Sequence, residues 1–344
     1  MSNITVLGID LAKEVFQVCG LNKANKSQFN RSLKRRELLS FVINHPDATV
    51  AMEACSSAHH WGRLFSEHGL KVKLVPAQFV KSFARGNKSD ALDALAIAEA
   101  SQRPNLNVVQ IKTIEQQDYQ TLLRVRSRLK EMRTAAINQA RGTLAEYGVI
   151  LPKSVAAFKR GIPLLLEDHE SDLSPIIRSV ICSLYDDYQT ITLRIDELDK
   201  QIAAIAANHP AIKPLLKLRG IGPITAVAVY ASVGNASHFR NGRQLAAWIG
   251  LVPKQHGTGG VTRLGGISKR GNQYLRMLLI HGARTVMNWM KNKADYLSIW
   301  TKQLVERKGK HKAMVALANK SARMIWVVLN KGVENTPAYY TTTV

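Results

Sequence analysis

Four carboxylates in the first hundred residues are spaced so that they could hold a divalent metal. Two of them end apolar runs, and two stand three residues apart at the start of the helical segment SDALDALAIAEA: Asp10, Glu53, Asp90 and Asp93. Residues three apart share one face of a helix. Carboxylates gathered in this way repel one another, whereas Mg²⁺ takes oxygen ligands and is bound together with phosphate groups. Two such ions about 4 Å apart are the usual device for phosphodiester chemistry.

Each of these acids also has a purely structural interpretation. Asp10 could cap the end of a strand. Ser89 and Asp90 could begin a helix, and Asp93 could be a first-turn acid that the helix dipole favours. Glu53 fits such a role less well, because the run TVAM before it should be buried. Together the four acids favour metal-dependent chemistry on phosphate esters.

A basic, glycine-rich stretch occupies residues 254–276. It contains six glycines, no acid and five cations: Lys254, Arg263, Lys269, Arg270 and Arg276. Such a loop can wrap a phosphate backbone, because glycine allows close approach and the cations neutralise phosphate charge. A solvated, unstructured loop would have a similar composition.

Residues 215–234 contain a glycine turn between two apolar stretches, Arg219-Gly220-Ile221-Gly222-Pro223. The pattern predicts a helix-hairpin-helix in which Arg219, Gly220 and Gly222 approach a nucleic-acid phosphate. The second helix would open at Pro223 and point its first N–H groups at that phosphate. An ordinary turn between two helices is the alternative.

The elements that position the acids are short and alternate between strand and helix. Strands are predicted at 4–10, 15–20 and around 28–30, followed by a helix at 36–44, a strand at 49–54, a helix at 59–69, a strand at 72–77 and a helix from Ser89. This is the order of a ribonuclease H-like α/β domain, which we assign to residues 1–110. In that sheet the first and fourth strands are neighbours, so Asp10 and Glu53 would lie side by side.

Residues 111–207 have the pattern of long helices. From about 113 to 145, apolar residues alternate with arginines and lysines, and residues 179–207 contain no Gly or Pro and keep apolar residues near heptad spacing. We interpret the segment as a helical hairpin or coiled coil that acts as a linker or an oligomer contact. An amphipathic helix on the surface of the same domain is the alternative.

Positive charge is concentrated in the last part of the chain. The 344 residues carry 48 Lys and Arg and 25 Asp and Glu, a net charge of +23; residues 208–344 alone carry 21 basic and 3 acidic residues. This excess predicts a polyanion partner whose affinity falls steeply with salt. A merely soluble basic protein, or one attracted to anionic membranes, would be the alternative. We assign 208–335 to a mainly α-helical basic domain and 336–344 to a tail.

Composition excludes several classes of protein. Hydrophobic residues make up 46%, with 22 Gly and 11 Pro, which is typical of a globular chain and not of a collagen-like or disordered one. Cys19, Cys55 and Cys182 form no Cys-x-x-Cys pair, so neither a disulfide framework nor a zinc site is indicated. The sequence has no signal segment and no membrane-spanning run, so we expect a cytoplasmic protein with no membrane partner.

Taken in order, these segments resemble a known family. GIDLAKE around Asp10, AMEA around Glu53, NKSDALDA around Asp90 and Asp93, then LRGIGPITA and GLVPKQHGTGGVTRLGGISKRGNQYLR, are similar to the DEDD transposases of insertion sequences. The group is family 110 in that nomenclature, with its 1111 subgroup, and is related to the Piv and MooV DNA invertases. The similarity runs from residue 4 to about residue 330, and the N-terminal domain of these proteins resembles RuvC-type Holliday-junction resolvases.

The resemblance implies a Mg²⁺-dependent recombinase, in which Mn²⁺ could replace Mg²⁺. The acidic tetrad would bind the metal, and a serine hydroxyl of the C-terminal domain would attack the scissile phosphate to form a 5′-phosphoserine link, with strand exchange through a Holliday junction. The implied partners are double-stranded DNA of the element ends and target, a structured bridge RNA that selects both, and further copies of the chain in dimers or tetramers. Such a protein would associate with the nucleoid of a prokaryotic cell.

The sequence departs from the family where the nucleophilic serine is expected. Here the glycine-rich stretch reads His256-Gly257-Thr258-Gly259-Gly260, so that Thr258 takes the matching position. A threonine hydroxyl can be a nucleophile when it is activated, although it is more crowded than serine. Ser268 is the nearest alternative hydroxyl, and an impaired, diverged copy of the enzyme is the remaining interpretation.

Two other functions fit parts of this pattern. A Holliday-junction-type nuclease with water as nucleophile would need only the acidic tetrad and would form no covalent protein–DNA product. A nucleic-acid-binding protein without catalysis would keep the basic domain and tolerate Asp10→Asn and Glu53→Gln. Four acids in this order argue against the second alternative.

Overall fold

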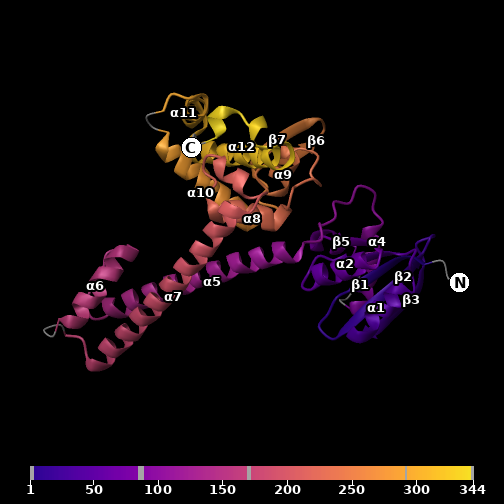
Figure 1. Cartoon of the computed structure of the whole chain (residues 1–344), viewed down its shortest axis with the longest axis horizontal. Helices are drawn as coiled ribbons and strands as arrows, with labels where there is room; N and C mark the ends of the chain where they lie inside the picture. The colour runs from indigo at the N-terminus through magenta and orange to yellow at the C-terminus, as the bar shows by residue number, and fades with distance from the viewer. Residues whose placement is uncertain (1–3, 84–88, 169–171, 291–292, 342–344) are drawn as a thin grey trace. The chain divides into compact units, whose positions relative to one another are not determined.

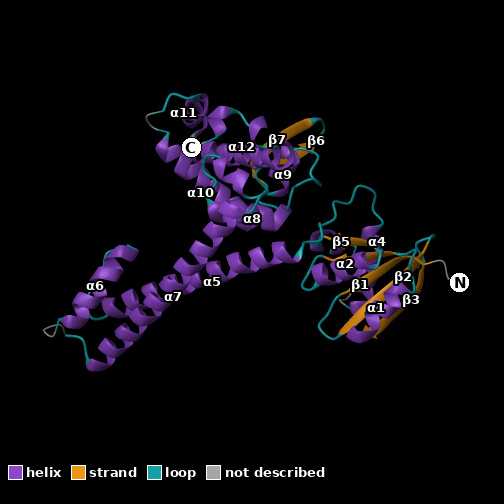
Figure 2. Cartoon of the chain, in the orientation of Figure 1, coloured by secondary structure: helices purple, strands orange, loops and turns teal. Residues whose placement is uncertain are grey.

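The chain folds into two compact units that divide in sequence between Glu115 and Gln116. The computed structural model describes residues 4–83, 89–168, 172–290 and 293–341. Named strands occur in two places among these residues, a five-stranded sheet in the first unit and a two-stranded hairpin in the second (Figure 2).

The first unit is built on a mixed sheet with the strand order β3-β2-β1-β4-β5. Its strands are β1 (Ile4–Asp10), β2 (Val15–Asn22), β3 (Ser27–Lys34), β4 (Thr49–Glu53) and β5 (Lys71–Val75). The pairs β1–β2 and β2–β3 are antiparallel, whereas β1–β4 and β4–β5 are parallel. The prediction of an α/β domain with neighbouring first and fourth strands is therefore confirmed.

Helices cover both faces of this sheet: α1 (Arg35–Ile43), α2 (Ala58–Glu67), α3 (Ala77–Val80) and α4 (Asp90–Ser101). Leu7 and Ile9 of β1 share a core with buried residues of α1 and α2, while Val6 shares a second core with buried residues of α4. A Cβ atom at Gly8 would lie 2.4 Å from the backbone oxygen of Ala94. Glycine is therefore required where α4 crosses β1, and α4 is the helix that begins with Asp90.

The second unit begins with long helices. These are α5 (Ile114–Ala145), whose first two residues precede the division, α6 (Val155–Glu167) and α7 (Pro175–Asn208). Helices α5 and α7 lie side by side (Figure 1), and Leu129 of α5 packs with Ile191 and Ile195 of α7. The guanidinium of Arg126 donates two hydrogen bonds to the carboxylate of Asp199, the longer of 3.0 Å. The heptad-like spacing therefore belongs to one side of a helical hairpin.

A proline lies inside α6. Pro163 has no N–H to donate to the carbonyl of Lys159, four residues earlier. The hydroxyl of Tyr185 in α7 donates to that carbonyl instead, at 3.1 Å. The packing of α6 on α7 thus satisfies the acceptor that the proline leaves open, which is why the helix continues through a residue that usually ends one.

The remainder of the second unit is mainly helical. Its elements are η1 (Lys213–Lys217), α8 (Pro223–Val233), α9 (Gly242–Trp248), β6 (Pro253–Thr258), β7 (Val261–Ile267), α10 (Gln273–Trp289), α11 (Tyr296–Lys308), α12 (Lys310–Lys331), η2 (Val333–Asn335) and η3 (Ala338–Tyr340). Helix α12 provides many of the buried core residues, and Leu123 of α5 and Ile202 of α7 belong to the same core.

The second unit has one core that both the helical segment and the basic segment share. A division between residues 207 and 208 therefore stays a prediction. The expected tail begins inside the core, because Tyr340 is 1% exposed and Thr341 forms a β-bridge with Leu218. Across the described parts of the chain, the helices are too short or too polar to cross a bilayer.

Candidate functional site

Asp10 and Glu53 end two adjacent strands of the sheet. In the parallel pair β1–β4, Ile9 lies opposite Met52, and the two acids are the next residues in register. Because side chains alternate along a strand, Asp10 lies on the same face as Gly8, the face on which α4 packs. Both acids are half-buried. The predicted pairing of these two positions is therefore present in the fold.

The thiol of Cys55 lies close to both acids. Burial raises the pKa of Cys55, and the carboxylates of Glu53 and Asp10 raise it further. Both effects favour the protonated thiol over the charged thiolate. Asp10 and Glu53 therefore both lie close enough to Cys55 to influence the pKa of its thiol.

The first turn of α4 carries the other two acids. Ser89 caps the helix, and its hydroxyl oxygen accepts from the N–H of Leu92 at 3.3 Å. Asp90 is exposed and Asp93 half-buried, and both lie in the first turn. The positive end of the helix dipole favours acids at these positions, so the capping interpretation of Ser89 and the metal-ligand interpretation of Asp90 are compatible.

A chain of amide and hydroxyl groups connects this turn to the sheet. Gln17 lies opposite Asp10 in the β1–β2 register, and its Nε2 donates to Oδ1 of Asn30 at 2.6 Å. The hydroxyl of Ser32 donates to Oε1 of Gln17 at 2.7 Å, and Nδ2 of Asn30 donates to the backbone oxygen of Ala91 at 2.7 Å. Sequence reasoning missed these three residues. The one signal was a glutamine within the otherwise apolar run VFQVCG.

The donor chemistry of the four acids suits a hard divalent cation, because all are carboxylates. Among the residues that the structure describes, however, no three His, Cys, Asp or Glu side chains lie close enough together to hold a metal ion. The fold thus places Asp10 beside Glu53 in strand register. The convergence of all four acids on one metal ion stays a prediction.

The glycine-rich stretch forms a β-hairpin. β6 and β7 pair antiparallel from Pro253 to Ile267, and Thr258 lies opposite Val261. The two residues between them, Gly259 and Gly260, have φ angles of 56° and 79°. A two-residue turn with both φ angles positive matches the twist of a hairpin and needs glycine or a similar residue. Thr258 is thus the last strand residue before the hairpin tip, and it is exposed.

The cations of this stretch divide into two groups. Lys254, Arg263, Lys269 and Arg270 are exposed, whereas Arg276 is 8% exposed. Nη1 of Arg276 donates to the backbone oxygens of Ile249 at 2.7 Å and Arg270 at 3.1 Å. These carbonyls lie just before β6 and just after β7. Arg276 therefore holds the base of the hairpin, while the other four cations are available to solvent.

Ser268, the alternative nucleophile, also lies at the base of the hairpin. Its N–H donates to the backbone oxygen of Val252 at 2.8 Å, and its Oγ accepts from the N–H of Arg270 at 3.5 Å. The side chain is half-buried, in contrast to exposed Thr258. Exposure therefore favours Thr258 as the hydroxyl that a large substrate could reach.

The glycine turn at 219–222 differs from the prediction in its first element. The residues before it form a short 3₁₀ helix, η1, and not an α-helix, so a helix-hairpin-helix is not confirmed. Gly220 has a φ angle of 80°, and a Cβ atom there would lie 2.9 Å from the backbone oxygen of Gly282. Its glycine is thus explained by packing on α10. Among the described residues, no atom would lie within 4 Å of a Cβ at Gly222, which is exposed.

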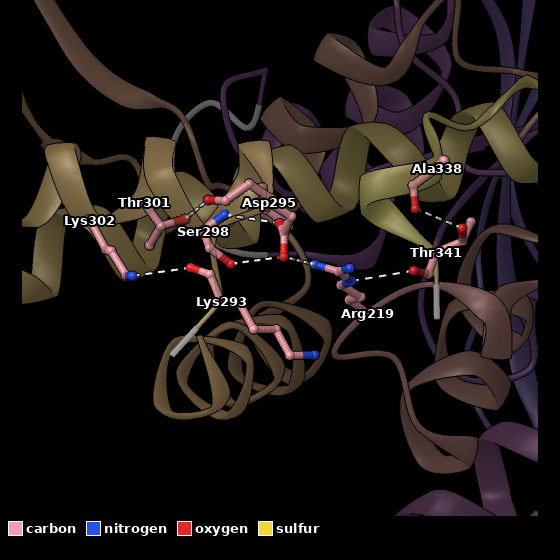
Figure 3. Close-up of polar contacts among 9 residues, drawn as sticks. Arg219, Lys293, Asp295, Ser298, Thr301, Lys302, Ala338 and Thr341 are labelled. Carbon is pink, nitrogen blue, oxygen red and sulfur yellow. Dashed lines mark hydrogen bonds and ion pairs between the residues drawn. The ribbon is translucent and has the colours of Figure 1, made fainter. Parts of the chain in front are cut away.

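Arg219 holds the end of the described chain in place. Its N–H donates to the backbone oxygen of Tyr340 at 3.0 Å, and Nε donates to that of Thr341 at 3.3 Å. Nη1 donates to Oδ2 of Asp295 at 3.0 Å (Figure 3). The guanidinium is already engaged within the unit, so its charge is partly neutralised.

Similarity to known proteins covers nearly the whole chain. A family model described as "Transposase" and named for the DEDD enzymes of IS110 matches residues 7–149, and one described as "Transposase IS116/IS110/IS902 family" matches residues 212–297. The DEDD transposase domain implies a RuvC-like fold, in agreement with the mixed sheet of the first unit.

Full-length relatives give the same assignment. The chain is 46% identical over 330 residues to a "Probable family 20 transposase" of Pseudomonas aeruginosa, covering 96% of this chain and 98% of the relative. It is 43% identical over 331 residues to the "Transposase for insertion sequence element IS1111A" of Coxiella burnetii, covering 96% and 91%. The transposase of element IS1328 from Yersinia enterocolitica is 36% identical over 332 residues. The chain therefore belongs to the IS110 family of insertion-sequence transposases, enzymes that cleave and rejoin DNA.

Proposed function

We propose that this transposase cuts and rejoins DNA with divalent metal, preferably Mg²⁺, bound by the acidic tetrad and with Thr258 as the nucleophile. The observation that carries the proposal is the placement of Asp10 and Glu53 at the carboxyl ends of adjacent parallel strands. Acids at this edge, on the face covered by the helix of Asp90 and Asp93, are suited to a phosphate-bound cation.

Each acid would have a defined part in this site. Asp10 and Glu53 form the fixed side, since strand register holds them together. Asp90 and Asp93 would complete the ligand set from the first turn of α4, which Asn30 ties to the sheet. When bound, Mg²⁺ or Mn²⁺ would stabilise the charge that develops on the phosphate oxygens during phosphoryl transfer.

The hydroxyl of Thr258 would supply the covalent step. Its Oγ1 would attack the scissile phosphorus, a new O–P bond would form, and the bond to the 3′ oxygen would break. The hydroxyl proton would pass to a base, and the departing 3′ oxygen would take up a proton. The product is a 5′-phosphothreonine and a free 3′ hydroxyl. Attack by a second 3′ hydroxyl on that phosphorus would restore both the phosphodiester and Thr258.

The partners would be nucleic acids and further copies of the chain. Exposed Lys254, Arg263, Lys269 and Arg270 support contacts with the DNA backbone, and the +18 charge of residues 208–344 supports binding of a polyanion. The family resemblance adds a structured bridge RNA as the guide. Exposed apolar side chains at the α6 end of the helical hairpin, Ile150, Leu164 and Ile176, support a homo-oligomer of two or four copies.

The metal site is tested by charge-neutral variants of the paired acids. Asp10→Asn and Glu53→Gln should each reduce Mg²⁺-dependent cleavage of DNA carrying the element ends by at least roughly a hundredfold, because each removes a charged metal ligand. DNA binding and the thermal unfolding midpoint should stay near wild type. Asp47→Asn is the matched control, since Asp47 is an exposed acid in the same unit. Wild-type cleavage in Asp10→Asn would rule out the acid site.

A further inference from the structure

A small cavity opens between the Arg219-Gly220 turn and the end of α10. Its volume is about 260 Å³, and it is lined by Arg219, Gly220, Thr285, Val286, Trp289, Met290 and Lys293. Pockets for drug-sized molecules typically measure ~300–1,000 Å³. The cavity therefore has room for one planar ring system with its substituents, and none of the chemistry proposed for the acids or for Thr258 uses it.

One wall of the cavity is held rigid by hydrogen bonds. Burial alone would raise the pKa of Asp295, but hydrogen bonds from Arg219 and Ser298 outweigh it, and the pKa lies below its usual value. The ionised carboxylate accepts from Arg219 and from the N–H and hydroxyl of Ser298, at 3.0, 3.1 and 3.0 Å (Figure 3). A ligand would thus meet a preformed surface and pay little ordering entropy there.

The rim of the cavity carries an exposed indole and a cation. Trp289, the last residue of α10, is 77% exposed, and within the described residues no aromatic ring or cation packs on it. Lys293 is exposed, and its backbone oxygen accepts from Nζ of Lys302 at 3.1 Å. Asp295 offsets the charge of Arg219, so Lys293 is the cation better placed for an incoming anion.

We propose that this cavity binds one unpaired nucleotide of a nucleic-acid strand, with its base stacked on Trp289 and its phosphate beside Lys293. Bases stack on exposed aromatic side chains whatever their sequence, and a base inside a double helix cannot reach such a ring. Charge complementarity selects a polyanion, because residues 208–344 carry 21 basic and 3 acidic residues. The inference rests on the proposed DNA chemistry and adds a contact for the single-stranded segments that strand exchange exposes.

The test compares single-stranded and double-stranded probes on the full-length protein. Trp289→Ala should bind a short oligothymidylate about tenfold more weakly, the loss expected for one base–aromatic stack, while the affinity for a duplex of equal length stays unchanged. Trp289→Phe should recover most of the affinity. Oligothymidylate should quench the tryptophan fluorescence of the wild type and not that of Trp289→Phe. An oligouridylate of the same length separates DNA from RNA as the source of the nucleotide.

A matched charge variant completes the design. Lys293→Ala should weaken oligothymidylate binding. It should also make the slope of log affinity against log salt less negative, by the contribution of about one phosphate contact. Lys308→Ala removes the same charge from the exposed surface of α11 and should have neither effect. Equal oligothymidylate affinity in Trp289→Ala and wild type would overturn the inference. A Trp289→Ala variant that loses self-association but keeps its oligothymidylate affinity would overturn it as well. If the wild type still cleaves DNA with metal, only this inference fails. If metal-dependent cleavage is absent while oligothymidylate binding needs Trp289, only the proposed chemistry fails.

Discussion

Asp10 and Glu53 owe their proximity to strand register, a property that short sequence patterns can predict. Each follows an apolar strand, and the order of strands and helices makes those strands neighbours. The residues that join the first turn of α4 to the sheet could not be found in this way. Gln17, Asn30 and Ser32 become a network only when β2 and β3 pair in one register, and polar residues in strands are common.

The half-buried histidine of α2, His59, predicts a pH dependence of stability. Nδ1 of His59 accepts from the N–H of Lys112 at 3.2 Å. Burial, with the charges of Lys112 and Arg63, lowers the pKa of His59 to about 4. An unfolded chain has a histidine pKa of about 6.5. Between these values the unfolded chain binds more protons, so the free energy of unfolding should fall as the pH drops from about 6.5 to 4.

His59→Asn keeps an acceptor for the N–H of Lys112 and removes the titration. Thermal unfolding midpoints measured from pH 7 down to pH 4 should therefore fall less steeply in this variant than in wild type. His60→Asn, at the exposed neighbouring position, should keep the wild-type slope. Equal slopes in His59→Asn and wild type would remove His59 as the cause.

At the scale of elements, the strands and helices of the first unit were predictable, whereas the β6–β7 hairpin was not. Six glycines and no apolar alternation make residues 254–276 look like a loop. The hairpin forms because Gly259 and Gly260 supply the positive φ angles of its turn and Arg276 bridges its two ends. The amino-acid composition cannot show that an arginine will be buried and bound to two backbone carbonyls.

Arg276→Lys should loosen the hairpin without changing its charge. Nη1 of Arg276 donates to both oxygens, and the shorter side chain of lysine would not bring its ammonium to that position. Lost charge-assisted hydrogen bonds cost about 1.5–3 kcal/mol each. We expect faster amide hydrogen exchange in residues 253–267 and slower DNA joining. The exposed Arg270 provides the control, since Arg270→Lys should leave exchange unchanged. Unchanged exchange in Arg276→Lys would show that other contacts hold the hairpin.

For the whole molecule, family membership could be inferred from the sequence because the acids, the glycine turn and the basic stretch occur in a fixed order over nearly the full chain. The roles of single cations could not be inferred from the sequence. Arg219 and Arg276 look like nucleic-acid contacts in sequence, yet one pairs with Asp295 and the other is buried. Both serve the packing of the second unit, so we propose that the exposed cations are the ones that contact DNA.

The charge distribution predicts how DNA affinity depends on salt. Each phosphate contact contributes a slope of about −0.9 to the plot of log affinity against log salt. Lys254→Ala combined with Arg270→Ala should make the slope less negative by about two contacts, because both side chains are exposed in the most basic part of the chain. Lys23→Ala, an exposed cation of the first unit, should leave it nearly unchanged. A wild-type affinity independent of salt would contradict backbone binding.

The most direct test of the proposed chemistry is a search for DNA covalently attached to Thr258. The protein is incubated with Mg²⁺ and DNA carrying the element ends, denatured and digested, and the modified peptide is located by mass spectrometry. We predict a 5′-phosphothreonine link in the wild type, a phosphoserine link in Thr258→Ser, and no adduct in Thr258→Ala or Asp10→Asn. Strand joining that persists in Thr258→Ala, an adduct on Ser268, or cleavage without any adduct would contradict the account.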